Sequence, residues 1–472
     1  MSSELCFQSA VKLSRMIRTR EVSVREVAEA HLEQIKKVNQ RVNAIVTLVP
    51  EEKVLDEADA ADRRLARGDK PALLHGLPTA HKDLFPTKGL RTTFGSPIFA
   101  DCVPDNDALI VERQKRAGAI TLGKTNTPEF GAGSQTFNAV FGATVNPYDT
   151  SKTCGGSSGG AAAALACGLV PLADGSDLGG SLRNPASFCN VVGFRPSPGR
   201  IPSWPSQNAW YNLAVQGPLA RTVEDAALFM SVIAGPDHRS PIAIEEPGSL
   251  FGRPLDRKLK NIRIAWSPGL GGLPVDRRVT EVLGNSVKVF QDLGCIVEEA
   301  FPDFSDADEI FQILRAWRYE FMYGSLLEKH RDRMKDSVVW NIEKGMRLTG
   351  PEIGAAERKR TELYHRVRTF METYEYLMLP VSQVPPFDVT APYVTEIDGV
   401  VMETYIDWMR SCYYISTIGN PAISVPAGFT AEGLPVGLQI VGRHHDDFGV
   451  LQIARAFEQA TEYGRKRPPI AV

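Results

Sequence analysis

Two glycine-rich loops, each carrying serine, constrain this chain more than any other stretch of its sequence. The first is Cys154–Gly160 (CGGSSGG) and the second is Gly175–Arg183 (GSDLGGSLR). Ser157 and Ser181 are 181 − 157 = 24 residues apart. A helix after the first loop and a strand before the second would fill that gap and bring both loops to one end of a layer.

The second loop has the composition of an oxyanion hole beside a nucleophile. Glycine turns tightly, accepts positive φ and leaves backbone N–H groups uncovered. The N–H groups of Gly179, Gly180 and Ser181 would point at one spot beside the Ser181 hydroxyl, where they can stabilise an oxyanion. The alternative is a pair of ordinary glycine turns capped by serines, because turns favour both residue types.

Other glycine-loop motifs do not match these residues. The phosphate loop G-x-x-x-x-G-K-[ST] requires a lysine, and none follows Gly160. The dinucleotide fingerprint G-x-G-x-x-G does not occur at this loop. The serine elbow G-x-S-x-G is absent because Leu182 and Arg183 follow Ser181. Ser181 therefore needs a base from elsewhere in the chain.

The chain resembles the amidase signature family of serine hydrolases. The resemblance depends on Gly155–Gly160, Asp177–Ser181 and, upstream, His81–Asp83. Supporting matches extend almost to the end of the chain, and they are Gly123–Glu129, Val192–Pro196, Gly217–Arg221 and Gly433–Gln439.

The resemblance implies a Ser–Ser–Lys triad. Ser181 would be the nucleophile, Ser157 the bridging serine after a cis peptide bond, and Lys82 the base. The family pattern further implies an oxyanion hole and a supporting set of residues. The hole would consist of the N–H groups of Leu178, Gly179, Gly180 and Ser181, and the supporting residues would be Ser158, Ser176, Asp177 and Arg183, the last two as an ion pair.

His81 departs from the family, which usually has an aliphatic residue at this position. A Ser181–His81 pair is the alternative to Lys82 as base. Neighbouring side chains in an extended segment point to opposite faces, so His81 would face away if Lys82 faces Ser157. Asp83 would either balance the charge of Lys82 or cap the following turn.

Composition excludes several classes of protein. The formal net charge of −3 suggests no nucleic-acid or membrane partner. Seven cysteines without a C-x-x-C pair are no disulfide framework and favour a reducing, cytoplasmic setting. We expect no signal peptide and no membrane span. The adjacent histidines in His444–Asp447 suit a tetrahedral metal ion poorly, and we expect neither a metal nor an organic cofactor.

Alternating helices and strands predict an α/β fold. Ser23–Asn39 begins with a capping box, Gly160–Ala166 needs small residues for close packing, and Ala307–Tyr376 reads as largely helical. The resemblance implies a central mixed, twisted sheet covered by helices on both faces. We expect one domain over residues 1–472, with a variable helical and loop region at about 305–410 that covers the site.

The expected function is hydrolysis of amide C–N bonds through an acyl-enzyme at Ser181. The aromatic content of the variable regions favours apolar or aryl amides, or carbamates (a urethanase activity), as small-molecule substrates. Trp204, Trp210 and Tyr211 would border the entrance. The alternatives are the A-type (glutaminase) component of a tRNA-dependent amidotransferase, a cyclic-amide hydrolase, and a catalytically inactive binding protein on this fold. The enzyme would be a monomer or homodimer.

Overall fold

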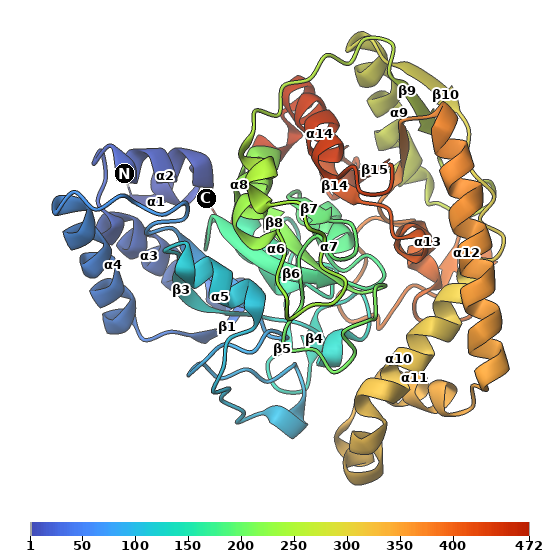
Figure 1. Ribbon diagram of the computed structural model, residues 1–472, viewed down its shortest axis with the longest axis horizontal. Coiled ribbons are helices and arrows are strands. Elements are labelled where there is room, and N and C mark those ends of the chain that lie inside the picture. The colour runs from blue at the N-terminus through green and yellow to red at the C-terminus, as the bar shows by residue number, and fades with distance from the viewer. Residues whose placement is uncertain (1, 472) are drawn as a thin grey trace.

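The computed structural model describes residues 2–471, and its centre is a mixed sheet of 11 strands (Figure 1). In spatial order the strands are β1 (Ile45–Leu48), β3 (Ile120–Thr125), β2 (Pro78–Lys82), β6 (Leu172–Asp177), β8 (Val215–Ala220), β7 (Val192–Arg195), β14 (Ala422–Phe429), β15 (Pro435–Gly442), β11 (Tyr376–Pro380), β9 (Arg263–Trp266) and β10 (Ile296–Glu299). The expected mixed sheet is therefore confirmed.

Strands β2 and β6 bring the two key segments together. They are parallel neighbours, with Ala80 opposite Ala173. The carboxyl ends of parallel strands lie at the same edge of a sheet, where ligands of open α/β sheets usually bind. β2 ends at Lys82, and β6 ends at Asp177, within the second glycine-rich segment and four residues before Ser181. The topology thus places Lys82 beside that segment.

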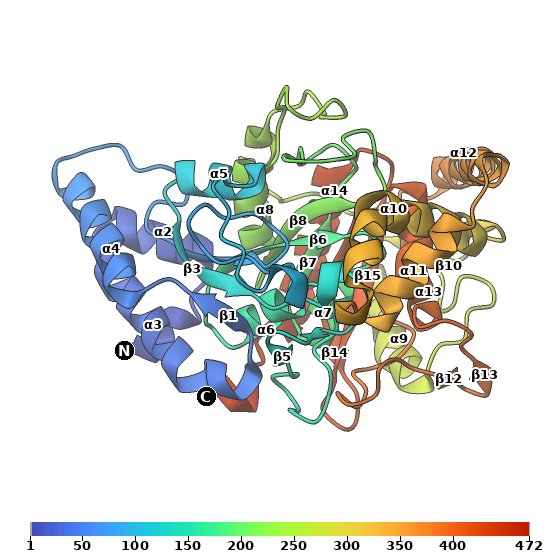
Figure 2. The same ribbon diagram turned by 90° about the horizontal axis from the view of Figure 1, so that it is seen from below.

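Helices cover both faces of the sheet. In Figure 2, α8 (Val223–Ile233) and α14 (Asp447–Thr461) lie on one side, and α6 (Gly159–Ala166) and α7 (Arg183–Phe188) lie on the other. α6 packs so closely that a Cβ on Gly160 would lie 2.3 Å from the Asn126 backbone nitrogen. This confirms that the helix after the first loop needs small residues. α9 (Arg277–Asp292) packs beside α14 through stacked Phe290 and Phe457 rings.

The N-terminal helices form one end of the molecule (Figure 1). They are α1 (Ser2–Cys6), α2 (Ala10–Arg18), α3 (Val24–Val42) and α4 (Glu51–Ala66), with α5 (Leu109–Arg116) between them and the sheet centre. Ser23 and Glu26 form the expected capping box at the start of α3. The apolar stripe of α3 is buried, so the helical period read from the sequence is confirmed.

The segment at 305–410 lies at the opposite end (Figures 1 and 2). It contains α10 (Ala307–His330), α11 (Asp336–Met346) and α12 (Gly350–Thr373), as the expectation of a largely helical block requires. A short hairpin follows, made of β12 (Glu396–Ile397) and β13 (Val400–Val401), and α13 (Arg410–Ile418) leads back to the sheet. A further two-stranded piece is formed by β4 (Phe137–Asn138) and β5 (Gly142–Ala143).

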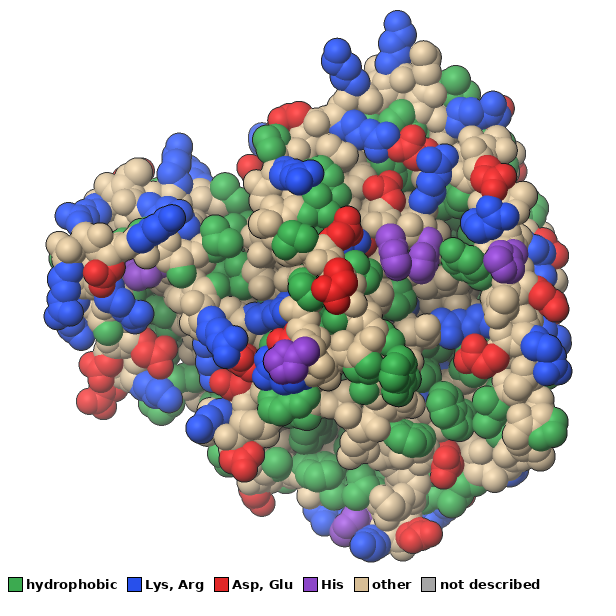
Figure 3. Space-filling view, viewed as in Figure 1, with side chains coloured by type: hydrophobic (Ala, Val, Ile, Leu, Met, Phe, Trp, Pro, Cys, Tyr) green, Lys and Arg blue, Asp and Glu red, His purple; other side chains and the backbone are tan. Residues whose placement is uncertain are grey.

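The distribution of surface charge and the state of the cysteines fit the small net charge and the cysteine content of the sequence. On the face shown in Figure 3, basic and acidic side chains alternate and no large area carries a single sign. No helix among residues 2–471 is long and apolar enough to span a membrane. The described residues also contain no disulfide.

Candidate active site

Lys82 lies at the centre of a buried cluster of hydroxyl groups. Its side chain is fully buried. The Nζ atom lies 2.8 Å from Ser157 Oγ, 2.8 Å from Ser158 Oγ and 3.1 Å from Ser176 Oγ. The structure therefore brings one predicted base and three predicted serines from two separate loops to one point.

The surroundings of Lys82 favour its neutral form. Burial lowers the pKa of Lys82 to about 7 because a charged ammonium loses its hydration. The carboxylates of Asp177 and Asp174 oppose this shift but do not cancel it. An amine with this pKa exchanges protons near neutral pH, as a general base must.

The loop that carries Ser157 is held by hydroxyl groups of another segment. The Gly156–Ser157 peptide bond is cis, as the family resemblance implies. Ser134 Oγ donates to the Gly156 carbonyl at 2.7 Å, and Thr136 Oγ1 donates to the Gly155 carbonyl at 2.8 Å. These bonds fix the position of the Ser157 hydroxyl relative to Lys82.

Ser181 lies in the loop between β6 and α7 and faces the same space as Ser157. The Ser158 N–H donates to the Ser181 carbonyl at 3.2 Å, which ties the two glycine loops together. Ser181 is 8% exposed and Ser157 is 3% exposed, and both line one cavity. The nucleophile proposed from sequence is thus reachable from that cavity.

The Gly180 N–H does not belong to the oxyanion hole, contrary to the prediction from sequence. This N–H donates to Asp177 Oδ1 at 2.8 Å and is not available to a substrate. The residue is needed for shape instead, because its φ is +119° and a Cβ would lie 2.5 Å from Cys412 Cβ. The N–H groups of Leu178, Gly179 and Ser181 have no partner among the described residues, so three predicted donors stay open.

Asp177 and Arg183 form the expected ion pair, and Arg195 extends it. Both guanidinium groups lie 3.0 Å from Asp177 Oδ1, and all three side chains are fully buried. The two arginines hold the pKa of the Asp177 carboxyl well below its usual range, against the effect of burial. Asp177 also accepts the Gly180 and Leu182 N–H groups, so it sets the shape of the loop that carries Ser181. Sequence reasoning missed Arg195 in this role.

We expect Asp177→Ala to lower the free energy of unfolding by about 3–5 kcal/mol, because it leaves two buried guanidinium groups without a carboxylate. Urea unfolding measures the change. The matched control is Glu372→Ala, which breaks the exposed pair with Arg368 and should cost less than about 1 kcal/mol. Equal effects of the two substitutions would contradict a structural role for the buried network.

His81 points away from Lys82, as strand alternation predicts. Its Nδ1 lies 2.6 Å from Asp174 Oδ2, and its Nε2 lies 3.0 Å from Thr121 Oγ1. Asp174 also accepts the Lys82 backbone N–H at 2.7 Å and the Gln114 amide at 2.7 Å. His81 therefore holds Asp174, which in turn positions the Lys82 backbone. Sequence reasoning missed Asp174, which carries no motif of its own.

The sequence left two roles open for Asp83, which were balancing the charge of Lys82 and capping the following turn. Its carboxylate accepts the Thr93 hydroxyl at 2.5 Å and the Thr93 N–H at 3.1 Å. Asp83 thus caps the following turn, whereas the carboxylates that act on Lys82 are those of Asp177 and Asp174.

The cavity in front of Ser181 has a volume of about 480 Å³, and most of the residues that line it are apolar or aromatic. Trp204 and Tyr211 line it, as predicted, but Trp210 does not and is 74% exposed. The aromatic and apolar lining also includes Leu84, Phe85, Pro86, Phe94, Phe130, Leu178, Pro205, Tyr319, Met322 and Tyr323. Helix α10 supplies Tyr319, Met322 and Tyr323, so the 305–410 segment does border the site.

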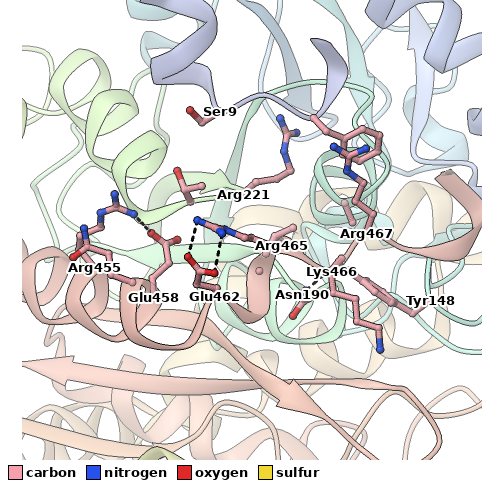
Figure 4. Close-up of a pocket in the computed structure, with 16 residues that line it drawn as sticks. Ser9, Tyr148, Asn190, Arg221, Arg455, Glu458, Glu462, Arg465, Lys466 and Arg467 are labelled. Carbon is pink, nitrogen blue, oxygen red and sulfur yellow. Dashed lines mark hydrogen bonds and ion pairs between the residues drawn. The ribbon is translucent and has the colours of Figure 1, made fainter. Parts of the chain in front are cut away.

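A larger cavity of about 570 Å³ lies elsewhere and is strongly polar (Figure 4). Both acidic side chains of its lining are paired with arginine, Glu458 with Arg455 and Glu462 with Arg465, each at 2.6 Å. Arg221 donates to backbone carbonyl groups. This cavity contains no nucleophile with a neighbouring base among the described residues, so we assign the chemistry to the cavity at Ser181.

Comparisons with known proteins agree with this site. A model of the amidase family matches residues 26–451. An acylamidase of Rhodococcus erythropolis is 37% identical over 98% of this chain and 97% of its own length. The A-type component of the glutamyl-tRNA(Gln) amidotransferase of Alkaliphilus metalliredigens is 33% identical over 95% of both chains. The crystal structure of a bacterial aryl acylamidase of the amidase signature family superposes with a TM-score of 0.91 at 28% identity, covering 97% of this chain and 98% of that one.

The family model spans most of the chain, and relatives above 30% identity cover nearly all of it. The neighbouring crystal structure has the same fold over the same length. The chain therefore belongs to the amidase signature family, whose enzymes hydrolyse carbon–nitrogen bonds of amides.

Proposed function

We propose that this enzyme hydrolyses amides through an acyl-enzyme on Ser181, with Ser157 as proton relay and Lys82 as general base. The observation that carries the proposal is the position of Lys82. It is a fully buried amine, 2.8 Å from the hydroxyl of Ser157, beside the cavity that Ser181 lines. Burial removes the hydration of the charged ammonium form at a high free-energy cost, so it favours the neutral amine that a general base requires.

In the proposed first step, neutral Lys82 takes the Ser157 proton while Ser157 takes the Ser181 proton, and Ser181 Oγ attacks the amide carbonyl carbon. The N–H groups of Leu178, Gly179 and Ser181 stabilise the oxyanion, each by about 3–4 kcal/mol. The relay then returns the proton to the leaving nitrogen, because an amide anion cannot leave unprotonated. Water repeats the sequence on the ester and releases the acid.

The substrate we propose is an apolar or aryl amide, or an aryl carbamate. The apolar and aromatic side chains that make up most of the cavity lining support this choice, because contact with an apolar or aryl substrate removes apolar surface from water. The names of the acylamidase and aryl acylamidase relatives point to the same bond type. No metal or organic cofactor enters the proposed chemistry.

The glutaminase and cyclic-amide alternatives differ in what the cavity must hold. Glutamine is small and polar and needs several hydrogen-bonding groups, whereas most lining residues here are apolar or aromatic. A hydrolase acting alone on a small molecule is therefore our preferred assignment. One domain over the whole chain, a reducing cytoplasmic setting, and a monomer or homodimer complete the proposal.

The proposal is tested by measuring amine release from an aryl anilide and the matching aryl carbamate, beside ammonia release from glutamine. We expect turnover of the anilide or the carbamate and none of glutamine. Faster turnover of glutamine than of either aryl compound would favour the amidotransferase alternative. A cyclic diamide assayed in parallel reports on the cyclic-amide alternative.

A further inference from the structure

Arg318 is a cation without a counter-ion in the wall of the Ser181 cavity. It lies on α10, and its guanidinium carbon stacks 5.0 Å above the centre of the Tyr211 ring. Within the described residues it has no hydrogen-bond partner and no carboxylate within 4.0 Å. The side chain is only partly exposed, so solvent does not surround it fully.

The rest of the cavity leaves this charge unbalanced. Among the described residues that line the cavity, Arg318 is the one charged side chain, and none is an aspartate or a glutamate. Aromatic neighbours lower the local dielectric constant and strengthen the field of the guanidinium inside the cavity. The field at this wall therefore favours a negatively charged group.

Other buried arginines of this protein have partners for their guanidinium groups. Arg183 and Arg195 share Asp177, and Arg200 pairs with Asp447 at 3.0 Å. Arg315, one turn before Arg318, has no carboxylate but donates to Asn341 and Tyr405. An arginine with a purely structural role in this fold thus has its donors occupied, and Arg318 does not.

Gln216 also lines the cavity. Its strand β8 pairs with β6 so that Gln216 lies directly opposite Ser176, whose hydroxyl contacts Lys82. Residues opposite each other in an antiparallel pair point to the same face. The side-chain amide oxygen Oε1 of Gln216 is buried without a hydrogen-bond partner and can accept a substrate N–H near the reacting bond.

We propose that Arg318 determines specificity by binding an anionic oxygen group, a carboxylate, that the amide substrate carries away from its scissile bond. A guanidinium presents paired N–H donors that match a carboxylate. The substrate class is then an amide with an apolar or aryl body and a terminal carboxylate. This inference rests on the proposed function, because it assigns a substrate to the Ser181 cavity.

The test uses two matched pairs of anilides that differ only in a charge. Glutaric acid mono-4-nitroanilide and its methyl ester place the charge on the acyl side, and 4-acetamidobenzoate and its methyl ester place it on the amine side. We expect kcat/KM of the wild type to favour the carboxylate in at least one pair by about 10- to 100-fold, since bonds to charged groups have this worth. Arg318→Met should abolish the preference through KM, and Arg318→Lys should restore part of it.

The control is Arg347→Met, which removes an exposed arginine at the end of α11 and should leave both rates unchanged. Equal use of both members of both pairs by the wild type, or an unchanged preference in Arg318→Met, would overturn the inference. Turnover of the neutral esters that depends on Ser181 would still support the proposed function in that case. Calorimetric binding of the same compounds to Ser181→Ala reads recognition without turnover, and carboxylate binding that survives Arg318→Met there would also overturn the inference.

Discussion

Ser181→Ala is expected to lower kcat by about four to six orders of magnitude, because removing the nucleophile of a triad leaves only the oxyanion hole and binding to act on the substrate. Ser181 is small and 8% exposed, so the loss of its hydroxyl should not disturb the fold. The measurement is amine release from the best anilide or carbamate, with far-UV circular dichroism to verify folding.

A serine in the same cavity provides the matched control for this experiment. Ser203 lines the cavity but lies outside the cluster of serines that Lys82 contacts. Ser203→Ala should therefore keep kcat within a fewfold of the wild type. Turnover by Ser181→Ala within tenfold of the wild type would show that another group attacks the carbonyl.

Lys82→Met should lower kcat by about 10²- to 10⁴-fold, the usual worth of a general base. The double variant with Ser181→Ala should be no slower than Ser181→Ala alone, because residues that act as one unit are not additive. Lys124→Met is the matched control, since Lys124 is also fully buried but bonds to Thr87 and the Phe85 carbonyl rather than to the serines. Lys124→Met should lower the free energy of unfolding but leave kcat closer to the wild-type value than Lys82→Met does. If the double variant lost kcat by the product of the two single effects, Lys82 would not act in one unit with Ser181, and the proposed relay would be contradicted.

The pH dependence follows from the same residue. Only neutral Lys82 accepts a proton, and its pKa is about 7. Lowering the pH below that value protonates the amine, so kcat/KM should fall about tenfold per pH unit on the acid side and level off above it. Initial rates from pH 5 to pH 9 measure this profile. A flat profile between pH 5 and pH 8 would contradict Lys82 as the base.

Much of the fold could be predicted because it follows from local patterns. The capping box at Ser23 and the 3.6-residue period of α3 act within one element, and so does the small-residue run of α6. The position of Lys82 opposite the serines follows from the family motifs and from strand alternation, which also sends His81 to the other face. Those rules depend on neighbours in sequence, and the sequence displays them directly.

The parts that could not be predicted depend on partners far apart in the chain or on the finished shape of a loop. The glycine pattern predicts that the Gly180 N–H belongs to the oxyanion hole, yet it donates to Asp177, because the buried Asp177 carboxylate recruits nearby donors. Asp174 supports Lys82 across a gap of 92 residues and lies in no motif. The isolation of Arg318 is a property of the finished cavity wall, which no local pattern encodes.

Trapping the acyl-enzyme tests the central claim most directly. The wild type, mixed with a slowly hydrolysed aryl carbamate or a serine-directed fluorophosphonate and then digested, is analysed by mass spectrometry. We predict a covalent adduct on the Ser181 hydroxyl, absent from Ser181→Ala and slower to form in Lys82→Met. An adduct on another residue, or amide turnover with Ser181 unmodified and replaceable, would contradict the account.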